Sequence, residues 1–168
     1  MKLVRTCRHC KPTWAGGLAL VVITGLAGPG TVAAQSDPTW DLSDLYPDLA
    51  AWEEAEAATS ARLAELEPLK GTLGKSAGKL KEALDLFYGL KKDLGRLRVY
   101  ASLLSDMDLR ESGPQGMKQS VQQLWAKFRA SSSWIDPEIL ALPSKKISRF
   151  LAADSGLEPY RRHLEKLE

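Results

Sequence analysis

Hydrophobic positions repeat at helical spacing soon after residue 48, which predicts a first amphipathic helix. Asp48 is a suitable N-cap because its carboxylate can accept a hydrogen bond from a free backbone N–H of the first turn. We expect this helix to run from residue 49 to about Glu67 and to end before Pro68. The positions of its buried face are Leu49, Trp52, Thr59, Leu63 and Leu66.

A glycine-containing loop from Pro68 to Gly78 separates this helix from a second, longer one. The second helix is predicted from about Ser76 to about Ser105, and its broad apolar face requires partners on more than one side. Gly89 and Gly95 are small enough to let a neighbouring helix approach. The positions of the apolar face are Leu80, Leu84, Leu86, Phe87, Leu90, Leu94, Leu97, Ala101, Leu103 and Leu104.

A third amphipathic pattern follows the connection from Asp106 to Gly116. Ser112 is a candidate cap and Pro114 a candidate first-turn residue for a helix that reaches about Ser133. Its face is formed by Met117, Val121, Leu124, Phe128 and Ser132, with Trp125 beside them.

Shorter helices are predicted after the third. Asp136 and Pro137 indicate a start for a helix that ends at Leu142, Ser144 is a candidate cap for residues 145–153, and Pro159 opens a last segment. The prediction is an all-α fold. It is an antiparallel helical bundle with two long helices, a third packed on them and shorter C-terminal helices.

The first 34 residues have the features of a signal peptide, with a basic start, an apolar run and small residues at a cleavage position. We predict cleavage between Ala34 and Gln35. The apolar run is shorter than the roughly 20 residues that span a bilayer, so we expect no stable membrane anchor. The chain is therefore expected to be exported, and to be periplasmic or secreted, with residues 35–48 as an irregular lead-in to a helical domain over residues 49–168.

Removal of this segment changes the charge of the chain. The full chain has 23 basic and 21 acidic residues, and the first 34 residues hold four basic residues and no acid. The remainder has 19 basic and 21 acidic residues, so its composition gives no reason to expect nucleic-acid binding. Cys7 and Cys10 also lie in this segment, which leaves the rest without cysteine and without disulfides.

Candidate chemistry is sparse after residue 34. His163 is the only histidine there, whereas a zinc site needs several His, Cys or carboxylate ligands together. Asp106 and Asp108 begin a calcium-loop pattern that fails at the later ligand positions. A basic set, Lys91, Lys92, Arg96 and Arg98, is interrupted by Asp93 and is interpreted as a solvated helix face. We expect no catalytic residue and no metal ligand in this chain.

Four stretches resemble the start of oligoendopeptidase F, a family of thimet-oligopeptidase-like zinc metallopeptidases. In order, they are Trp40-Asp41-Leu42-Ser43-Asp44-Leu45-Tyr46-Pro47, then Gly95-Arg96-Leu97 with Val99-Tyr100-Ala101, then Asp136-Pro137-Glu138-Ile139-Leu140-Ala141-Leu142-Pro143, and last Leu157-Glu158-Pro159-Tyr160-Arg161 leading to Leu164. The likeness covers nearly all of the chain after the signal peptide.

The resemblance implies an all-helical peptidase whose N-terminal helical region forms one wall of a deep channel that admits short peptides. It also implies a zinc ion, held in the family by a His-Glu-x-x-His helix and a downstream Glu that no residue here matches. The partners it implies are oligopeptides and a missing C-terminal catalytic domain. The last helical pattern ends at Glu168 without a cap, and we interpret the chain as truncated and as inactive by itself.

Two alternatives stay open at this point. The chain could be an independent exported helical module that binds peptides or a protein partner without chemistry. A coiled-coil-like envelope protein is the other alternative, although loops interrupt the heptads that it requires.

Overall fold

The computed structural model describes residues 40–167, and every regular element among them is helical. The all-α prediction is confirmed. The predicted signal peptide, its cleavage position at Ala34 and Gln35, and the first residues of the lead-in lie outside the described residues. None of the helices within residues 40–167 has the length and apolar character needed to cross a membrane.

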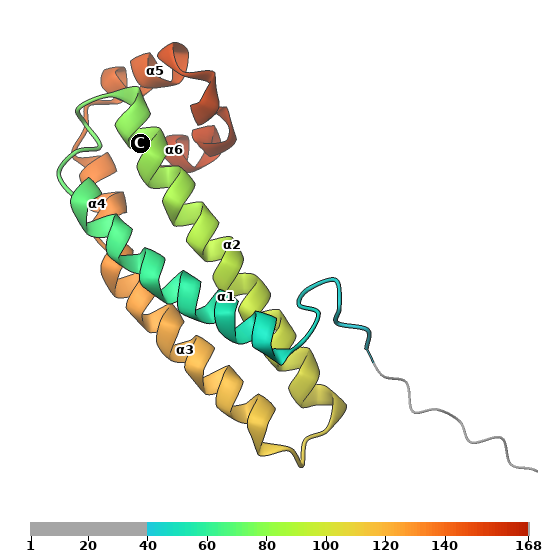
Figure 1. Ribbon diagram of the computed structural model, residues 1–168. Coiled ribbons are helices and arrows are strands. Elements are labelled where there is room, and N and C mark those ends of the chain that lie inside the picture. Colours follow the sequence, from blue (N-terminus) through green and yellow to red (C-terminus); the bar gives the residue numbers. More distant parts are fainter. Residues whose placement is uncertain (1–39, 168) are drawn as a thin grey trace, which may run out of the picture. The chain divides into compact units, whose positions relative to one another are not determined.

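The longest helices form a hairpin (Figure 1). In it α2, Ala77–Met107, is followed by the antiparallel α3, Ser112–Ser132. Helix α1, Leu49–Arg62, packs against α2, and the 3-10 helix η1, Leu63–Leu69, contacts both members of the hairpin. The predicted bundle of long helices is therefore confirmed.

The shorter C-terminal elements pack near the N-terminal half of α2 (Figure 1). They are α4, Ile135–Leu140, α5, Ser144–Ala153, the 3-10 helix η2, Ser155–Tyr160, and α6, Arg161–Leu167. They contact α2 through α5 and η2, whereas α4 packs on α6. The half of the α2–α3 hairpin that contains the C-terminal half of α2 is therefore not covered by these elements.

Two predicted helix starts are confirmed by their capping bonds. The Asp48 carboxylate accepts a hydrogen bond from the Ala51 N–H at 2.8 Å, and the Ser76 hydroxyl accepts one from the Lys79 N–H at 3.1 Å. Both caps are local interactions within one turn, which is why sequence spacing could predict them.

The predicted end of the first helix is wrong. Helix α1 ends at Arg62, and the chain tightens into η1, which includes Pro68. The proline ring excludes regular α-helix over the preceding turn because it clashes with the carbonyl four residues earlier and restricts the residue before it. A short 3-10 helix accommodates the ring and still buries Leu63, Leu66 and Leu69.

Three predicted caps are also wrong, because each helix begins one or more residues earlier than its polar residue suggested. Ser112 and Ser144 are the first helical residues of α3 and α5, and neither helix has a side-chain cap bond. Helix α4 begins at Ile135, before Asp136. The last segment begins as η2 at Ser155, so that Pro159 lies inside it.

Leucine side chains dominate the core, and most of the predicted apolar face of α2 lies in it. On the predicted buried face of α1, Leu49 is an exception, because 47% of its surface is exposed. Gly95 also has no neighbour within 4 Å of the position of a Cβ atom, so no helix approaches there. Fully buried leucines are Leu66, Leu73, Leu80, Leu84, Leu90, Leu94, Leu97, Leu157 and Leu164.

Candidate functional site

The lead-in is attached to α2 by its second half. Tyr46 is buried and meets the Tyr100 ring edge to face, with 5.4 Å between the ring centroids. The Arg96 guanidinium donates to the Leu45 carbonyl at 2.8 Å and lies 5.3 Å from the centre of the Tyr46 ring. Leu42 adds a buried apolar contact. Residues of the first two family-like stretches, around Tyr46 and Tyr100, therefore bind one another.

The first half of the lead-in is more exposed. Trp40 is 63% exposed, so it does not hold the lead-in to the bundle by burial. Asp41 accepts a hydrogen bond from the Ser43 N–H at 3.0 Å, and its bonds with Ser43 lower the pKa of its carboxyl. Asp44 and Pro47 are exposed. These residues shape a turn and belong to no group of three or more His, Cys, Asp or Glu side chains that could hold a metal ion among the described residues.

Trp52 and Trp134 use their indole N–H groups structurally. The buried Trp52 donates to the Leu97 carbonyl of α2 at 3.1 Å, and Trp134 donates to the Ser131 carbonyl at 2.7 Å. Both indoles are therefore accounted for by packing and hydrogen bonding.

Glu138 joins α4 to the loop before α2, a role that sequence reasoning missed. Its carboxylate accepts hydrogen bonds from the Gly71 N–H at 2.7 Å and from the Leu73 N–H at 2.8 Å. Gly71 has a φ of 74°, which glycine adopts without the steric cost of a side chain. Pro137 beside it is exposed. The third family-like stretch thus bonds a loop that lies more than 60 residues earlier in the chain.

The fourth stretch fastens the C-terminal helices. Tyr160 stacks on Tyr88 with 5.2 Å between ring centroids, and its hydroxyl donates to Asp85. Burial, together with that hydrogen bond, raises the pKa of the Tyr160 phenol to about 12. Pro159 is exposed within η2.

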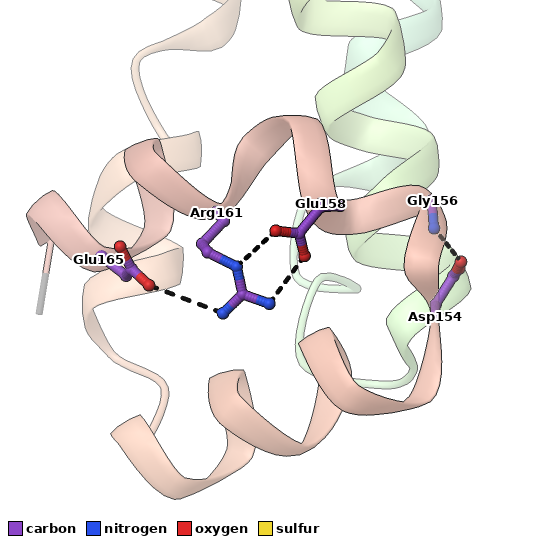
Figure 2. A network of polar contacts seen from close by, with 5 residues as sticks. All are labelled: Asp154, Gly156, Glu158, Arg161 and Glu165. Carbon is purple, nitrogen blue, oxygen red and sulfur yellow. Dashed lines mark hydrogen bonds and ion pairs between the residues drawn. The ribbon is translucent and has the colours of Figure 1, made fainter.

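Arg161 connects the adjacent turns. Figure 2 shows its guanidinium between Glu158, at 2.7 and 2.8 Å, and Glu165, at 3.6 Å, with the Asp154 cap of Gly156 nearby. The hydrogen bonds from Arg161 lower the pKa of the Glu158 carboxyl below its usual value.

His163 does not belong to a metal or catalytic cluster within the described residues. Its ring meets Tyr88 edge to face at 5.9 Å, and its Nε2 lies 3.2 Å from Asp136 without hydrogen-bond geometry. No three His, Cys, Asp or Glu side chains converge on a possible metal position within residues 40–167. These residues do not fit the zinc site that the resemblance implies.

One hollow between α2 and α3 has a different character. It has a volume of about 570 Å³ and its charged lining residues are all cations. Sequence reasoning grouped Arg98 with Arg96, but Arg96 contacts the lead-in whereas Arg98 lines this hollow. We call it the basic groove, and its lining residues are Arg98, Ser102, Lys118, Gln122, Trp125 and Arg129.

Proteins that resemble this chain in sequence and in fold have names that identify them as peptidases. Oligopeptidase PepF of Bacillus subtilis is 30% identical over 139 residues, which are 83% of this chain and 21% of that protein. The plasmid-encoded oligoendopeptidase F of Lactococcus lactis subsp. cremoris is 27% identical over 77% of this chain and 22% of its own length. The crystal structure of oligoendopeptidase-F from Enterococcus faecium aligns with a TM-score of 0.64 and 27% identity, over 69% of this chain and 23% of that one. The chain is homologous to oligoendopeptidase F.

The homology has a defined extent. The chain spans about a fifth of the length of the curated oligoendopeptidase F relatives that it matches. A putative peptidase from Chlamydophila abortus gives a similar structural match, with a TM-score of 0.62 and 26% identity over 77% of this chain and 22% of that one. No family model matches the sequence.

The oligoendopeptidase F likeness and the contacts above concern the same residues. In each of the four stretches, at least one side chain bonds or packs across to another element. The stretches that resemble this family therefore provide contacts that hold the helices of this chain together.

Proposed function

We propose that this chain is the N-terminal helical region of an exported oligoendopeptidase-F-type zinc peptidase, and that it forms one wall of a channel for short peptides. The observation that carries the proposal is similarity over 83% of the chain to a protein named oligopeptidase PepF. The long hairpin and its fastenings suit a wall, because a rigid surface excludes folded proteins by shape.

The chemistry belongs to another part of the peptidase in this proposal. Residues 40–167 contain one histidine, and its neighbours are Tyr88 and Asp136. Such a residue cannot supply both a metal ligand set and a general base. The role proposed for this chain is to limit which peptides enter the channel, and the chain alone is expected to hydrolyse nothing.

The test uses the purified 168-residue chain, an eight-residue quenched fluorescent peptide and a folded protein as a second substrate. We expect no cleavage by the chain alone, with or without added zinc. When the catalytic remainder of an oligoendopeptidase F is supplied in trans, we expect cleavage of the peptide but not of the folded protein. Chelator-sensitive cleavage by the chain alone would contradict the proposal, as would a remainder whose selectivity does not depend on the chain.

Export is tested separately. Expression of the full chain in a bacterium, followed by fractionation, should place the mature form outside the cytoplasm with Gln35 as its first residue. A protein that keeps residues 1–34 and stays in the cytoplasm would refute the export proposal and leave the channel role untouched.

A further inference from the structure

The basic groove is lined by one stripe from each helix of the hairpin. Arg98 and Ser102 are four residues apart on α2, and the α3 residues Lys118, Gln122, Trp125 and Arg129 follow at intervals of four, three and four. Residues at these intervals share one helix face. The two stripes therefore face one another across the seam of the hairpin.

This face lies opposite the side of α2 that is bound to α1 and the lead-in. Asp93 bonds Arg62 of α1 at 2.7 Å, and Arg96 bonds the Leu45 carbonyl. Arg98 follows Arg96 by two residues, which is about 200° around a helix. The C-terminal elements pack near the N-terminal half of α2 (Figure 1), whereas Arg98 and Ser102 lie in its C-terminal half.

The charges of the groove have no carboxylate partner in the part of the chain that the structure describes. Within residues 40–167, Arg98, Lys118 and Arg129 have no carboxylate within 4.0 Å. Three other hollows of the described surface each include at least one acidic residue in their lining. A concave surface lined by one sign of charge concentrates its potential and attracts ions of the opposite sign.

Trp125 adds an apolar wall with an unsatisfied donor. Its ring packs edge to face on Phe128 with 5.6 Å between centroids, which fixes one side of the indole. The indole N–H is shielded from solvent and has no hydrogen-bond partner among the described residues. Because a water molecule cannot reach this N–H, Trp125 offers the groove the apolar face of its ring and not a hydrogen-bond donor.

We infer that the basic groove is a binding subsite for a carboxylate-bearing oligopeptide. Arginine guanidinium groups bind carboxylates through paired N–H donors, which favours Arg98 and Arg129 as the main contacts. Gln122 and Ser102 can bond peptide amides, and the Trp125 face suits an aliphatic side-chain stem. The inference rests on the proposed function, because that function makes peptides the class of ligand.

The first test compares peptides on the full 168-residue chain. The probes are acetylated, amidated Ala-Glu-Ala-Glu-Ala and its isosteric Gln counterpart, with acetate and inorganic phosphate as free anions. Titrations are followed by the indole N–H signal of Trp125 in a nitrogen-15 spectrum, assigned with W125F. We expect the Glu peptide to shift this signal and to bind at least tenfold more tightly than the Gln peptide or acetate.

The second test uses matched double variants. R98Q/R129Q removes two charges from the groove, whereas K92Q/K127Q removes two exposed charges from the same helices outside it. We expect at least a tenfold loss of Glu-peptide affinity in the first variant and less than a twofold change in the second. Circular dichroism and thermal melts verify that both variants fold.

Three results would overturn the inference. They are equal binding of the Glu and Gln peptides, equal weakening by both double variants, and binding of phosphate as tight as that of the Glu peptide. Because no readout here depends on hydrolysis, these results leave the peptidase proposal standing. Failure of the cleavage experiment would instead remove the peptidase proposal without affecting a measured peptide affinity.

Discussion

The polar side chains on the two faces of the α2–α3 hairpin differ in whether they bond another part of the chain. On the face toward α1, Asp93 bonds Arg62, Arg96 bonds the lead-in, and Ser120 donates to Glu56. On the opposite face, Arg98 and Arg129 line the basic groove and have no carboxylate partner among the described residues. Each face has an arginine of α2, Arg96 on one and Arg98 on the other, so residue type alone does not separate the faces.

The difference is one of partners. A charge that bonds another element of the chain contributes to the fold, although an exposed pair contributes only about 0–1 kcal/mol. A charge that faces an open hollow without a partner contributes little to the fold and stays available to a ligand. The polar side chains of the α1 face therefore stabilise the fold, whereas those of the groove face are available to the peptide ligand that we infer.

The largest effect is expected where both faces share one core. Leu94 is completely buried between them, and Leu94→Ala should lower the free energy of unfolding by about 2–5 kcal/mol because it leaves a cavity. Urea denaturation measures the change. A loss below about 1 kcal/mol would mean that the hairpin is not a common support for the two faces.

A smaller loss of stability is expected when the Glu138 hydrogen bonds to the loop before α2 are removed. Glu138→Ala leaves the Gly71 and Leu73 N–H groups without their acceptor and should cost about 1–3 kcal/mol of unfolding free energy. Glu138→Gln is the control, because it retains one acceptor oxygen and should lose less. Equal losses in the two variants would show that the side-chain volume matters and the bonds do not.

The smallest stability effect is expected from acid. Burial raises the pKa of Asp85, but the hydrogen bonds from Lys81 and Tyr160 outweigh it, so the folded pKa lies below the usual 3.8. A lowered folded pKa stabilises the fold above about pH 4, and this contribution is lost as the pH falls through the folded pKa. The stability difference between the wild type and Asp85→Asn, measured by urea denaturation, should therefore shrink below about pH 4. A difference that is constant from pH 7 to pH 2 would exclude this role.

The fold was predictable from sequence to the extent that its determinants are local. Helical spacing and the caps at Asp48 and Ser76 predicted elements that the structure confirms. The prediction of helix caps from polar residues was wrong at three positions, Ser112, Asp136 and Ser144. The helices there begin without a side-chain cap bond. Local residue preference cannot distinguish a capping serine from a first-turn serine when packing decides the boundary.

The contacts of the candidate site depend on distant pairs, which spacing does not reveal. Glu138 bonds a loop 65 residues earlier, and Tyr160 reaches Asp85 across 75 residues. The basic groove needs Arg98 and Arg129 on separate helices to converge, whereas the sequence places Arg98 beside Arg96. The helical period places Arg96 and Arg98 about 200° apart around α2, but the packing of the lead-in on one side and of α3 on the other decides which arginine bonds the chain and which lines the groove.

The most direct test of the division between the faces compares Arg96→Gln with Arg98→Gln, measuring for each the free energy of unfolding and the affinity for the Glu peptide. Arg96→Gln should lower the free energy of unfolding by about 1 kcal/mol, since it removes a charged hydrogen bond and a cation–π contact, and should leave affinity within twofold. Arg98→Gln should leave the free energy of unfolding within about 0.5 kcal/mol and weaken peptide binding several-fold. If both variants alter the same quantity, or if Arg96→Gln weakens binding and Arg98→Gln destabilises the fold, the two faces do not differ as described.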